Sequence, residues 1–437
     1  MYDRLLTLSA TELARVIRER QASAREVVES HLRRIRQVND RLNAVVQLDG
    51  EAALRAAAGA DDDLARGIIH GPFHGVPFTV KDWIETSGLI CAAGMEQRSR
   101  YIPPRDATVV ARIRSAGGIL LGKTNVVGGS PVYPRPNNPH DLGRTPGSSS
   151  SGEAAIVAAG GSPFGLASDS GGSIRVPAHF CGGVGYRPSA GLVPLTGHYP
   201  RIGALSDPRT TIGPIARRIE DLYPILRTIA GPDGTDPSVV PVWIGDPVEV
   251  NPADLRVAWF TALDGASPTN ETVAAVESAA SAMSKRGARV REARPDDVDQ
   301  SMSISRSYWA RIRSSSWKEW VPEAKSSLAA EETERSIFEW ERFQRSMLAF
   351  MRNWDAIITP VAATPAFPHR ELIGEDYLYT LPWTLTGQPA IAVPCASSSE
   401  EIPIAVQVIG PRWRDDIAIA VARTLEEAFG GWRMAGM

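Results

Sequence analysis

Short apolar segments of two kinds alternate along the first half of the chain, and this alternation limits the folds that are open to it. Residues 76–81 and 164–168 are typical of buried strands, whereas residues 108–116 and 151–159 have the composition of helices. A further short strand pattern lies at 119–121. Strands that alternate with helices predict an α/β fold, in which helices cover a sheet.

The rest of the chain adds elements of the same kinds. Helical periodicity at 9–20 and 24–37 predicts two N-terminal helices, and Ser9 and Ser23 are their expected N-caps. Further strands are predicted at 256–260, 355–359, 390–393 and 405–409, and a last helix at 415–429. These elements extend the α/β pattern nearly to the C-terminus.

Composition narrows the class of protein. The 437 residues carry a formal net charge of −3, which favours neither a nucleic acid nor an anionic membrane as partner. The N-terminus lacks the apolar core of a signal peptide, and no apolar run approaches the roughly 20 residues of a membrane span. Cys91, Cys181 and Cys395 are too widely spaced for a zinc or disulfide framework. We therefore expect a cytoplasmic protein without a metal site.

Two serine- and glycine-rich clusters, residues 147–152 and 168–173, lie one predicted helix apart, and Lys81 precedes them at the end of a strand pattern. Serine hydroxyls, a lysine and backbone amides freed by glycine are the parts of a nucleophile, a base and an oxyanion hole. Each cluster borders an apolar element, whereas a flexible linker has polar neighbours. The clusters indicate acyl transfer at an amide-like carbonyl.

Other catalytic motifs are weaker. Residues 117–124 match the P-loop expression, but their apolar middle predicts a buried strand after a helix, which is the wrong order for a phosphate loop. The nucleophile elbow G-x-S-x-G is absent. A Ser-His-Asp triad through His74 or His179 stays open beside the alternative that both are ordinary loop histidines.

The chain resembles the amidase signature family. The matching blocks are residues 75–82, 122–125, 147–153, 169–178, 180–182 and 191–194. The resemblance is dense over residues 70–215 and weaker over 354–430. It implies one amidase signature domain spanning 1–437, with a central mixed β-sheet flanked by helices and a core at 70–230 and 354–430. Residues 300–350 would be a helical, tryptophan-rich insertion or substrate wall.

The resemblance also implies a Ser-cisSer-Lys triad, with Ser173 as nucleophile, Ser149 as the cis-serine and Lys81 as base. One departure is visible, because the family's Gly-Gly-Ser-Ser-Gly-Gly reads Gly-Ser-Ser-Ser-Ser-Gly at 147–152. Ser148 and Ser151 therefore replace glycines, and the cis-serine assignment is ambiguous by one position, with Ser150 as the alternative.

An oxyanion hole would follow from the same blocks. The resemblance implies that it consists of the backbone amides of Ser170, Gly171, Gly172 and Ser173. We expect Asp169 and Arg175, which flank this turn, to support it rather than to react.

The chemistry of such a triad can be argued without the family. A lysine with a pKa of about 10.4 is protonated at neutral pH, but burial penalises the charged form. Val76, Phe78 and Val80 supply apolar surroundings for Lys81. A serine hydroxyl donates and accepts at once, so Ser149 can pass a proton between Ser173 and Lys81.

These features predict a hydrolase without a cofactor that cleaves the carbonyl C–N bond of apolar or aromatic small molecules. The substrate would be an amide, or a carbamate or ester cleaved by the same route, and the enzyme a monomer or homodimer. Candidate wall residues are Tyr133, Trp309, Trp317, Trp320 and Trp340. Core packing is the alternative for the four tryptophans, but they lie in the segment that resembles the family least, which favours the wall.

Two other functions remain as alternatives. One is the glutaminase-like subunit of a tRNA-dependent amidotransferase, which needs protein partners and tRNA. Against it, Asn125 is followed by Val126-Val127-Gly128-Gly129 and not by the expected acidic, aromatic run. The other is a catalytically inactive binding module, which the three filled triad positions disfavour.

Overall fold

Strands β2 (Pro77–Lys81) and β4 (Phe164–Asp169) lie side by side and parallel at the heart of the fold, and every residue of both is buried. The computed structural model describes residues 2–126, 130–200, 208–312 and 329–437. Because parallel neighbours end at the same edge of a sheet, Lys81 and Asp169 are brought to one edge. The segments that follow these strands contain the candidate catalytic residues.

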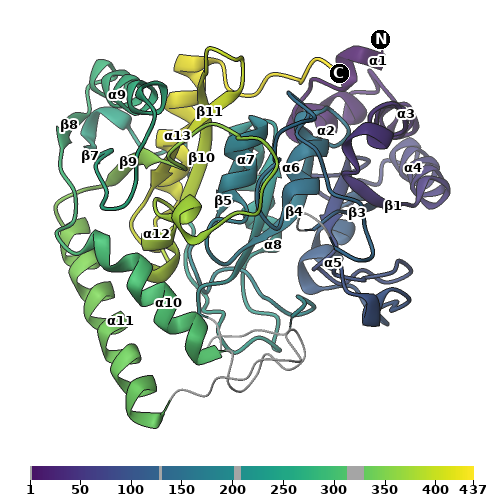
Figure 1. Cartoon of the computed structure of the whole chain (residues 1–437). Helices are drawn as coiled ribbons and strands as arrows, with labels where there is room; N and C mark the ends of the chain where they lie inside the picture. Colours follow the sequence, from purple (N-terminus) through teal and green to yellow (C-terminus); the bar gives the residue numbers. More distant parts are fainter. Residues whose placement is uncertain (1, 127–129, 201–207, 313–328) are drawn as a thin grey trace.

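The described strands form one mixed sheet of eleven, in the order β1-β3-β2-β4-β6-β5-β10-β11-β9-β7-β8. Figure 1 shows β7 and β8 on one side of the molecule and β1 on the other. Pairing is antiparallel through its middle and parallel from β3 to β4 and from β9 to β8. The remaining strands are β1 (Val45–Leu48), β3 (Ile119–Thr124), β5 (Val184–Arg187), β6 (Thr211–Ala216), β7 (Arg256–Trp259), β8 (Arg289–Glu292), β9 (Ala356–Pro360), β10 (Ala390–Ser397) and β11 (Pro403–Ile409).

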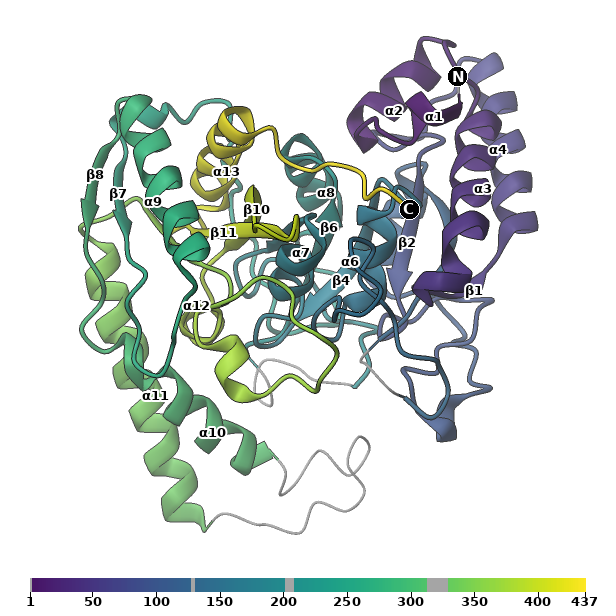
Figure 2. The ribbon, with the colours of Figure 1, turned by 45° about the horizontal axis from the view of Figure 1, so that its top comes forward.

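Helices flank this sheet, as the α/β pattern predicts (Figure 2). Their bounds are α1 (Tyr2–Leu5), α2 (Ala10–Arg18), α3 (Ala24–Leu42), α4 (Gly50–Ala65), α5 (Thr108–Ser115), α6 (Ser151–Ala158), α7 (Arg175–Cys181), α8 (Leu222–Ile229), α9 (Asn270–Lys285), α10 (Ser301–Ile312), α11 (Ala330–Met351), α12 (Leu381–Thr386) and α13 (Asp415–Phe429). Short 3₁₀ helices lie at Glu96–Arg98, Ile219–Asp221, Pro252–Asp254, Val298–Gln300 and Gly374–Tyr377.

The predicted helix starts are confirmed in detail. Ser9 and Ser23 cap α2 and α3, and each forms a capping box with the glutamate three residues later, Glu12 and Glu26. Each box satisfies backbone amides that a helix otherwise leaves without partners. The predicted strands at 76–81, 119–121 and 164–168 are present as β2, β3 and β4, although β3 is three residues longer than expected.

Helix α6 is buried on all sides, which explains its composition of alanine, valine and isoleucine. It contacts α3, α7 and the strands β2 and β4. A helix that is apolar all round belongs inside a protein. Its burial fixes the serine run, which ends at the first turn of α6, directly beside the ends of β2 and β4.

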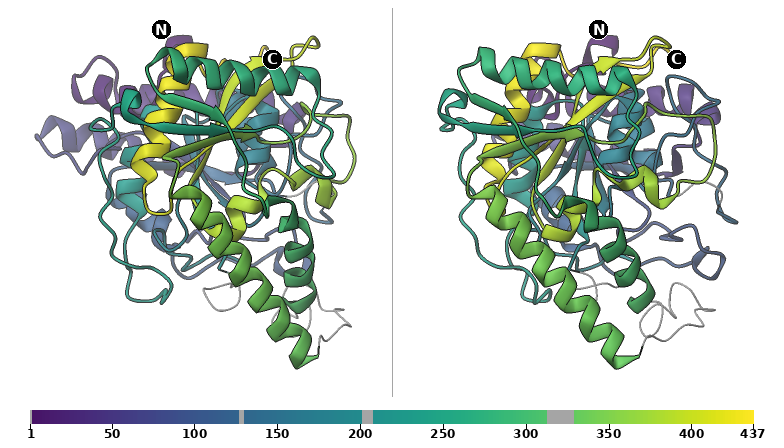
Figure 3. Two further views of the ribbon diagram at one scale, coloured as in Figure 1. Left: turned by 90° about the vertical axis from the view of Figure 1, so that its left-hand side faces the viewer. Right: turned by 60° about the vertical axis from the view of Figure 1, so that its left-hand side comes forward.

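Residues 230–350, which resemble the family least, belong to the same domain. Strands β7 and β8 come from this segment and extend the sheet through β9. Helices α10 and α11 contact each other and pack on α12, and Figure 3 shows them extending away from the sheet side by side. The chain thus forms a single domain. Within the described residues, no helix combines the length and apolar character needed to cross a membrane.

Candidate active site

Three segments that are distant in the sequence meet at the edge where β2 and β4 end. Lys81 is the last residue of β2, the serine run leads into α6, and the turn 170–173 joins β4 to α7. The P-loop-like segment does not form a phosphate loop, because it is the buried strand β3 and its Lys123 ammonium donates to the Ile84 carbonyl and the Thr86 hydroxyl.

Lys81 is enclosed completely, with an exposed fraction of 0%. Its Nζ lies 2.7 Å from Ser149 Oγ, 3.0 Å from Ser168 Oγ and 3.3 Å from the Ser168 carbonyl oxygen. Burial lowers the pKa of Lys81 well below its ordinary value, and the nearby carboxylates of Asp169 and Glu153 oppose this effect without cancelling it. A neutral amine at this position can accept a proton from Ser149.

Glu153 is, beside Asp169, the second buried carboxyl group whose charge acts on Lys81. It accepts hydrogen bonds from the hydroxyls of Thr79 and Thr124, at 2.8 Å from the latter. Burial raises the pKa of Glu153 to about 7, although both hydrogen bonds and the two lysines Lys123 and Lys81 lower it. Burial therefore holds the pKa of Glu153 above its ordinary value, while its charged form raises the pKa of Lys81.

Ser173 is in contact with a different serine. Its Oγ lies 2.8 Å from Ser148 Oγ, and the Tyr377 hydroxyl donates to that same Ser148 Oγ at 2.7 Å. In the part of the chain that the structure describes, no hydrogen bond joins Ser173 to Ser149. The structure therefore brings the three expected triad residues to one site but leaves the link between Ser173 and Ser149 open.

The expected cis geometry at Ser149 is not found. Among the described residues, the cis peptide bond lies between Tyr199 and Pro200, so the bond before Ser149 is trans. The alternative Ser150 has no hydrogen bond to the lysine in the described residues; its hydroxyl donates at 3.3 Å to the Ser168 carbonyl, to which Lys81 donates as well. Of the two candidates, Ser149 is the serine that contacts Lys81.

The turn after β4 has the features of an oxyanion hole. The backbone amides of all four predicted residues, Ser170, Gly171, Gly172 and Ser173, donate to no residue in the described part of the chain. Gly172 has a φ of +143°, and a Cβ there would lie 2.5 Å from the Thr380 hydroxyl oxygen, so the turn needs glycine. Ser170 anchors the start of the turn through its hydroxyl, 2.6 Å from that of Thr210.

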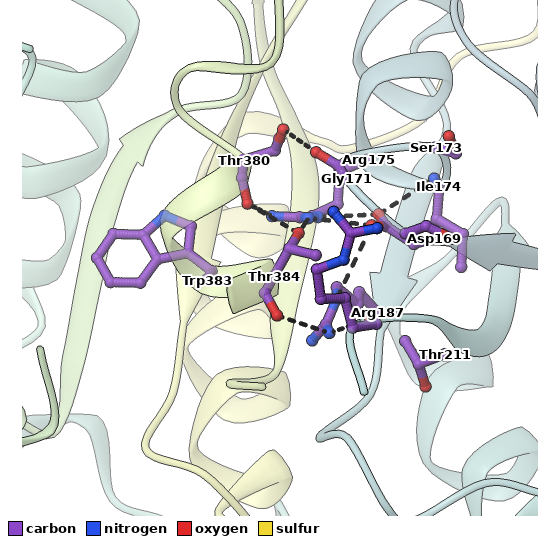
Figure 4. A network of polar contacts seen from close by, with 12 residues as sticks. Asp169, Gly171, Ser173, Ile174, Arg175, Arg187, Thr211, Thr380, Trp383 and Thr384 are labelled. Carbon is purple, nitrogen blue, oxygen red and sulfur yellow. Dashed lines mark hydrogen bonds and ion pairs between the residues drawn. The ribbon is translucent and has the colours of Figure 1, made fainter. Parts of the chain in front are cut away.

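Asp169 and Arg175 form a buried ion pair beneath this turn (Figure 4). The Arg175 guanidinium donates to both carboxylate oxygens, at 3.0 and 3.1 Å, and the Ile174 amide donates to the same carboxylate at 3.2 Å. Burial raises the pKa of Asp169, but Arg175 and the more distant Arg187 outweigh it and hold the pKa below its ordinary value. These contacts fix the turn to the start of α7.

Arg175 also ties the turn to α12. Its guanidinium donates to the Thr380 carbonyl at 3.1 Å, the Thr384 hydroxyl at 2.7 Å and Gln407 Oε1 at 3.1 Å. The Thr380 hydroxyl in turn donates to the Gly171 carbonyl. The turn after β4 is thus fixed by two sets of contacts, one to Asp169 at the end of β4 and one to Thr380 at the start of α12.

The predicted wall residues have different positions. The indole ring of Trp340 is only 8% exposed, packs edge-on against Tyr308 and donates its N–H to the Leu385 carbonyl at 2.8 Å. This packing and this hydrogen bond favour a core position of the Trp340 ring over a contact with substrate. The Trp309 side chain, Trp317 and Trp320 lie outside what the structure describes.

Tyr133 is half-buried and tied to a carboxyl group next to the lysine. Its hydroxyl donates to Asp82 Oδ2 at 2.9 Å. Burial raises the pKa of Asp82 to about 6 despite the nearby Lys123. Tyr133 thus contacts the segment that directly follows Lys81.

The histidines offered for a Ser-His-Asp triad have other partners. His179 Nδ1 accepts from the Ala405 amide at 2.8 Å, and its Nε2 lies 3.1 Å from the Thr364 carbonyl. His74 Nε2 lies 3.0 Å from the Ala60 carbonyl. Neither ring contacts Ser149 or Ser173 in the described residues. Across the same residues, no three His, Cys, Asp or Glu side chains gather as metal ligands.

Sequence reasoning missed the residues that surround the triad. Ser168 lies in a recognised cluster, but its contact with Lys81 depends on the alternation of β4. His198 Nε2 lies 2.9 Å from Ser168 Oγ, and Tyr377 contacts Ser148. His198 and Tyr377 have no motif around them, so only the tertiary structure reveals them. His198 also lines a cavity of about 640 Å³ with Glu85 and Tyr101, which the triad residues do not line.

Comparisons with known proteins show which family the chain resembles. A family model described as Amidase matches residues 26–418. The chain is 32% identical to an acylamidase of Rhodococcus erythropolis, over 96% of this chain and 95% of the relative. It is 33% identical to a glutamyl-tRNA(Gln) amidotransferase subunit of Koribacter versatilis, over 97% and 98%. The structure of 6-aminohexanoate cyclic dimer hydrolase complexed with substrate is similar, with a TM-score of 0.86, 26% identity and 99% of both chains covered.

Proposed function

The chain belongs to the Amidase family, and on this premise we propose that it cleaves the carbonyl C–N bond of apolar or aromatic small-molecule amides through an acyl-enzyme on Ser173. The observation that carries the proposal is the contact of the buried Lys81 amine with Ser149, 2.7 Å away, beside a turn whose amides are free. A buried lysine with a lowered pKa is a suitable base at neutral pH.

In the proposed acylation, a proton leaves Ser173 through a relay, and a C–O bond to Ser173 replaces the C–N bond of the substrate. Ser173 Oγ attacks the carbonyl carbon while its proton passes to Ser149, whose own proton passes to Lys81. The carbonyl oxygen becomes negative and accepts hydrogen bonds from the amides of Gly171, Gly172 and Ser173. The C–N bond then breaks as the proton returns through Ser149 to the leaving nitrogen, which gives a free amine and an ester on Ser173.

Deacylation repeats these steps with water. Water gives its proton to the same relay, attacks the ester carbon, and releases a carboxylic acid and the Ser173 hydroxyl. No step requires a cofactor. Carbamates and esters are proposed as further acyl donors, because the relay and the oxyanion turn act on the carbonyl and not on one leaving group.

The substrate class is supported by the relatives and by the surroundings of Ser173. One relative is named an acylamidase, and a structural neighbour is named 6-aminohexanoate cyclic dimer hydrolase. The Tyr377 hydroxyl donates to the Ser148 hydroxyl, which in turn contacts Ser173 Oγ, so the phenol ring lies close to Ser173. An aromatic ring at this distance favours apolar or aromatic acyl or leaving groups over charged ones.

The test is trapping of the acyl group. Wild type quenched during turnover of an aryl amide should gain the mass of the acyl group on the peptide that contains Ser173, and Ser173→Ala should lose both the adduct and essentially all turnover. A panel of aryl amides, aliphatic amides, aryl carbamates and aryl esters then ranks the substrates. Full turnover by folded Ser173→Ala protein would overturn the proposal.

The amidotransferase relatives support a second candidate, a glutaminase subunit. The same relay would release ammonia from glutamine and pass it to a partner complex that holds tRNA. Glutamine therefore belongs in the panel. Glutamine hydrolysis faster than aryl amide hydrolysis, together with a co-purified partner protein, would replace the first proposal by this one.

A further inference from the structure

Ser148 places a second hydroxyl on the nucleophile at a position where the family pattern has glycine. Its Oγ lies 2.8 Å from Ser173 Oγ. A glycine there would leave Ser173 without this partner. Ser148 is half-buried in the loop before α6, and Ser149 next to it faces Lys81 instead. Of the two adjacent serines, Ser148 thus contacts the proposed nucleophile Ser173, and Ser149 contacts the proposed base Lys81.

Tyr377 fixes the direction of the hydrogen bond between these serines. Its hydroxyl has one partner among the described residues, Ser148 Oγ at 2.7 Å, to which it donates. Burial raises the pKa of Tyr377 to about 12, so the phenol keeps its proton at neutral pH. Since Ser148 Oγ already accepts from Tyr377, the proton of Ser148 is free to point at Ser173 Oγ.

We propose that Ser148 and Tyr377 are positioning residues, which hold Ser173 Oγ as a hydrogen-bond acceptor and leave its own proton directed to Ser149. The inference rests on Ser173 being the nucleophile of the proposed function. A donor on the nucleophilic oxygen also favours its deprotonated form, which matters when the base is a lysine acting through a second hydroxyl. The Tyr377 hydroxyl acts only through Ser148.

The geometry of Tyr377 supports this role. Tyr377 ends the short 3₁₀ helix Gly374–Tyr377, and the following Thr380 donates to the carbonyls of Tyr377 and of Gly171 in the oxyanion turn. A Cβ on Gly172 would lie 3.1 Å from the Tyr377 ring. The phenol and the oxyanion turn are thus held as one unit, so the direction given to Ser173 is fixed relative to the amides.

The test compares Ser148→Ala, Tyr377→Phe and the double variant, with Ser151→Ala as matched control. Ser151 is the other serine at a glycine position of the same loop, and its buried hydroxyl has no partner in the described residues. We expect kcat/KM for an aryl amide to fall about five- to tenfold in Ser148→Ala, as for loss of one neutral hydrogen bond. In Tyr377→Phe, kcat/KM should fall by no more than in Ser148→Ala. In Ser151→Ala, kcat/KM should stay within about twofold of the wild-type value.

Two further readouts distinguish positioning from a structural role. Inactivation by a small sulfonyl fluoride, which reacts with Ser173 without needing the substrate pocket, should slow by the same factor as kcat/KM. The midpoint of the pH–rate limb should stay unchanged, because Ser148 does not contact Lys81. The double variant should be no worse than Ser148→Ala, since the Tyr377 hydroxyl acts only through Ser148.

Several results would overturn the inference. A Ser148→Ala protein with wild-type kcat/KM, or one that loses only melting temperature, excludes a positioning role. A loss as large as that of Ser149→Ala would make Ser148 a member of the relay. Additive losses in the double variant would give Tyr377 a role of its own. If Ser173→Ala is fully active, the proposed function fails, whereas an inactive Ser173→Ala with an unaffected Ser148→Ala refutes the positioning role alone.

Discussion

Lys81 Nζ lies 2.7 Å from Ser149 Oγ and is sealed from solvent. The amine has two further partners on Ser168, its hydroxyl and its carbonyl oxygen. A neutral amine has two N–H donors and one lone pair. The Ser168 oxygens can accept both N–H groups, because the Ser168 hydroxyl can place its own proton on His198 Nε2, 2.9 Å away. The lone pair is then left for the Ser149 hydroxyl.

Single replacements in the relay should cost nearly as much as combined ones. We expect Lys81→Ala and Ser149→Ala to lower kcat by at least about 10³-fold, and the double variant to be little worse, because residues that act as a unit show strongly non-additive losses. The measurement is kcat for an aryl amide, with far-ultraviolet circular dichroism to confirm folding.

Ser150→Ala serves as the neighbouring control for this relay. Its hydroxyl donates to the Ser168 carbonyl and has no hydrogen bond to the lysine in the described residues, so the loss of activity should be much milder. The opposite ranking, with Ser150→Ala inactive and Ser149→Ala active, would move the relay serine by one position.

The rate should rise with pH through the ionisation of Lys81. Burial lowers the pKa of Lys81, and the neutral form is the proposed base, so kcat/KM should increase as pH rises through a midpoint below the ordinary value of about 10.4. The carboxylates of Asp169 and Glu153 raise this pKa. Glu153→Gln removes one of these charges and should therefore move the midpoint to lower pH.

The check is the pH profile of kcat/KM for wild type and Glu153→Gln, with an uncharged aryl amide as substrate. A histidine base would give a rise of kcat/KM with a midpoint at about pH 6.5, and Glu153→Gln would not move that midpoint. A midpoint that moves upward in Glu153→Gln would contradict the assigned direction of the electrostatic effect.

The local signals in the sequence predicted the centre of the fold well. Strands β2 and β4 are continuous apolar runs, and α6 and the caps of α2 and α3 follow from composition and from serine–glutamate spacing. The strands β1, β5, β6 and β8 were missed. β5 and β6 contain glycine or proline, and β8 lies at the sheet edge with charged, largely exposed residues, so none has the apolar run by which we recognised a strand.

The candidate site was predictable to the extent that its residues lie in motifs. Lys81, Ser149 and Ser173 meet at one edge because β2 and β4 are parallel neighbours. The partners Tyr377 and His198 come from distant loops, and their contacts depend on how α12 and the segment before Pro200 pack. The trans bond before Ser149 and the contact of Ser173 with Ser148 are likewise properties of the folded loop, which neither composition nor spacing encodes.

Trp340→Ala should reduce stability and leave substrate choice unchanged. The ring is buried against Tyr308 and its N–H is paired with Leu385, so truncation should lower the free energy of unfolding by about 3–5 kcal/mol. The ratio of kcat/KM for aromatic and small aliphatic amides should equal that of wild type. Chemical denaturation and the two-substrate assay measure both, and a changed ratio at unchanged stability would restore Trp340 to the substrate wall.

Arg175→Met should destabilise the protein and inactivate it together. The change leaves the buried Asp169 carboxylate with Arg187, whose nearest nitrogen is 3.8 Å away, and breaking a buried pair from one side costs about 3–5 kcal/mol. Turnover should fall as well, because Arg175 joins the oxyanion turn to α12.

The matched control is Arg345→Met, which breaks an exposed ion pair with Glu341 and should cost under about 1 kcal/mol without changing turnover. Denaturant titration and kcat of both variants test this, and an Arg175→Met protein that loses stability but keeps wild-type kcat would show that the turn holds its geometry without the ion pair.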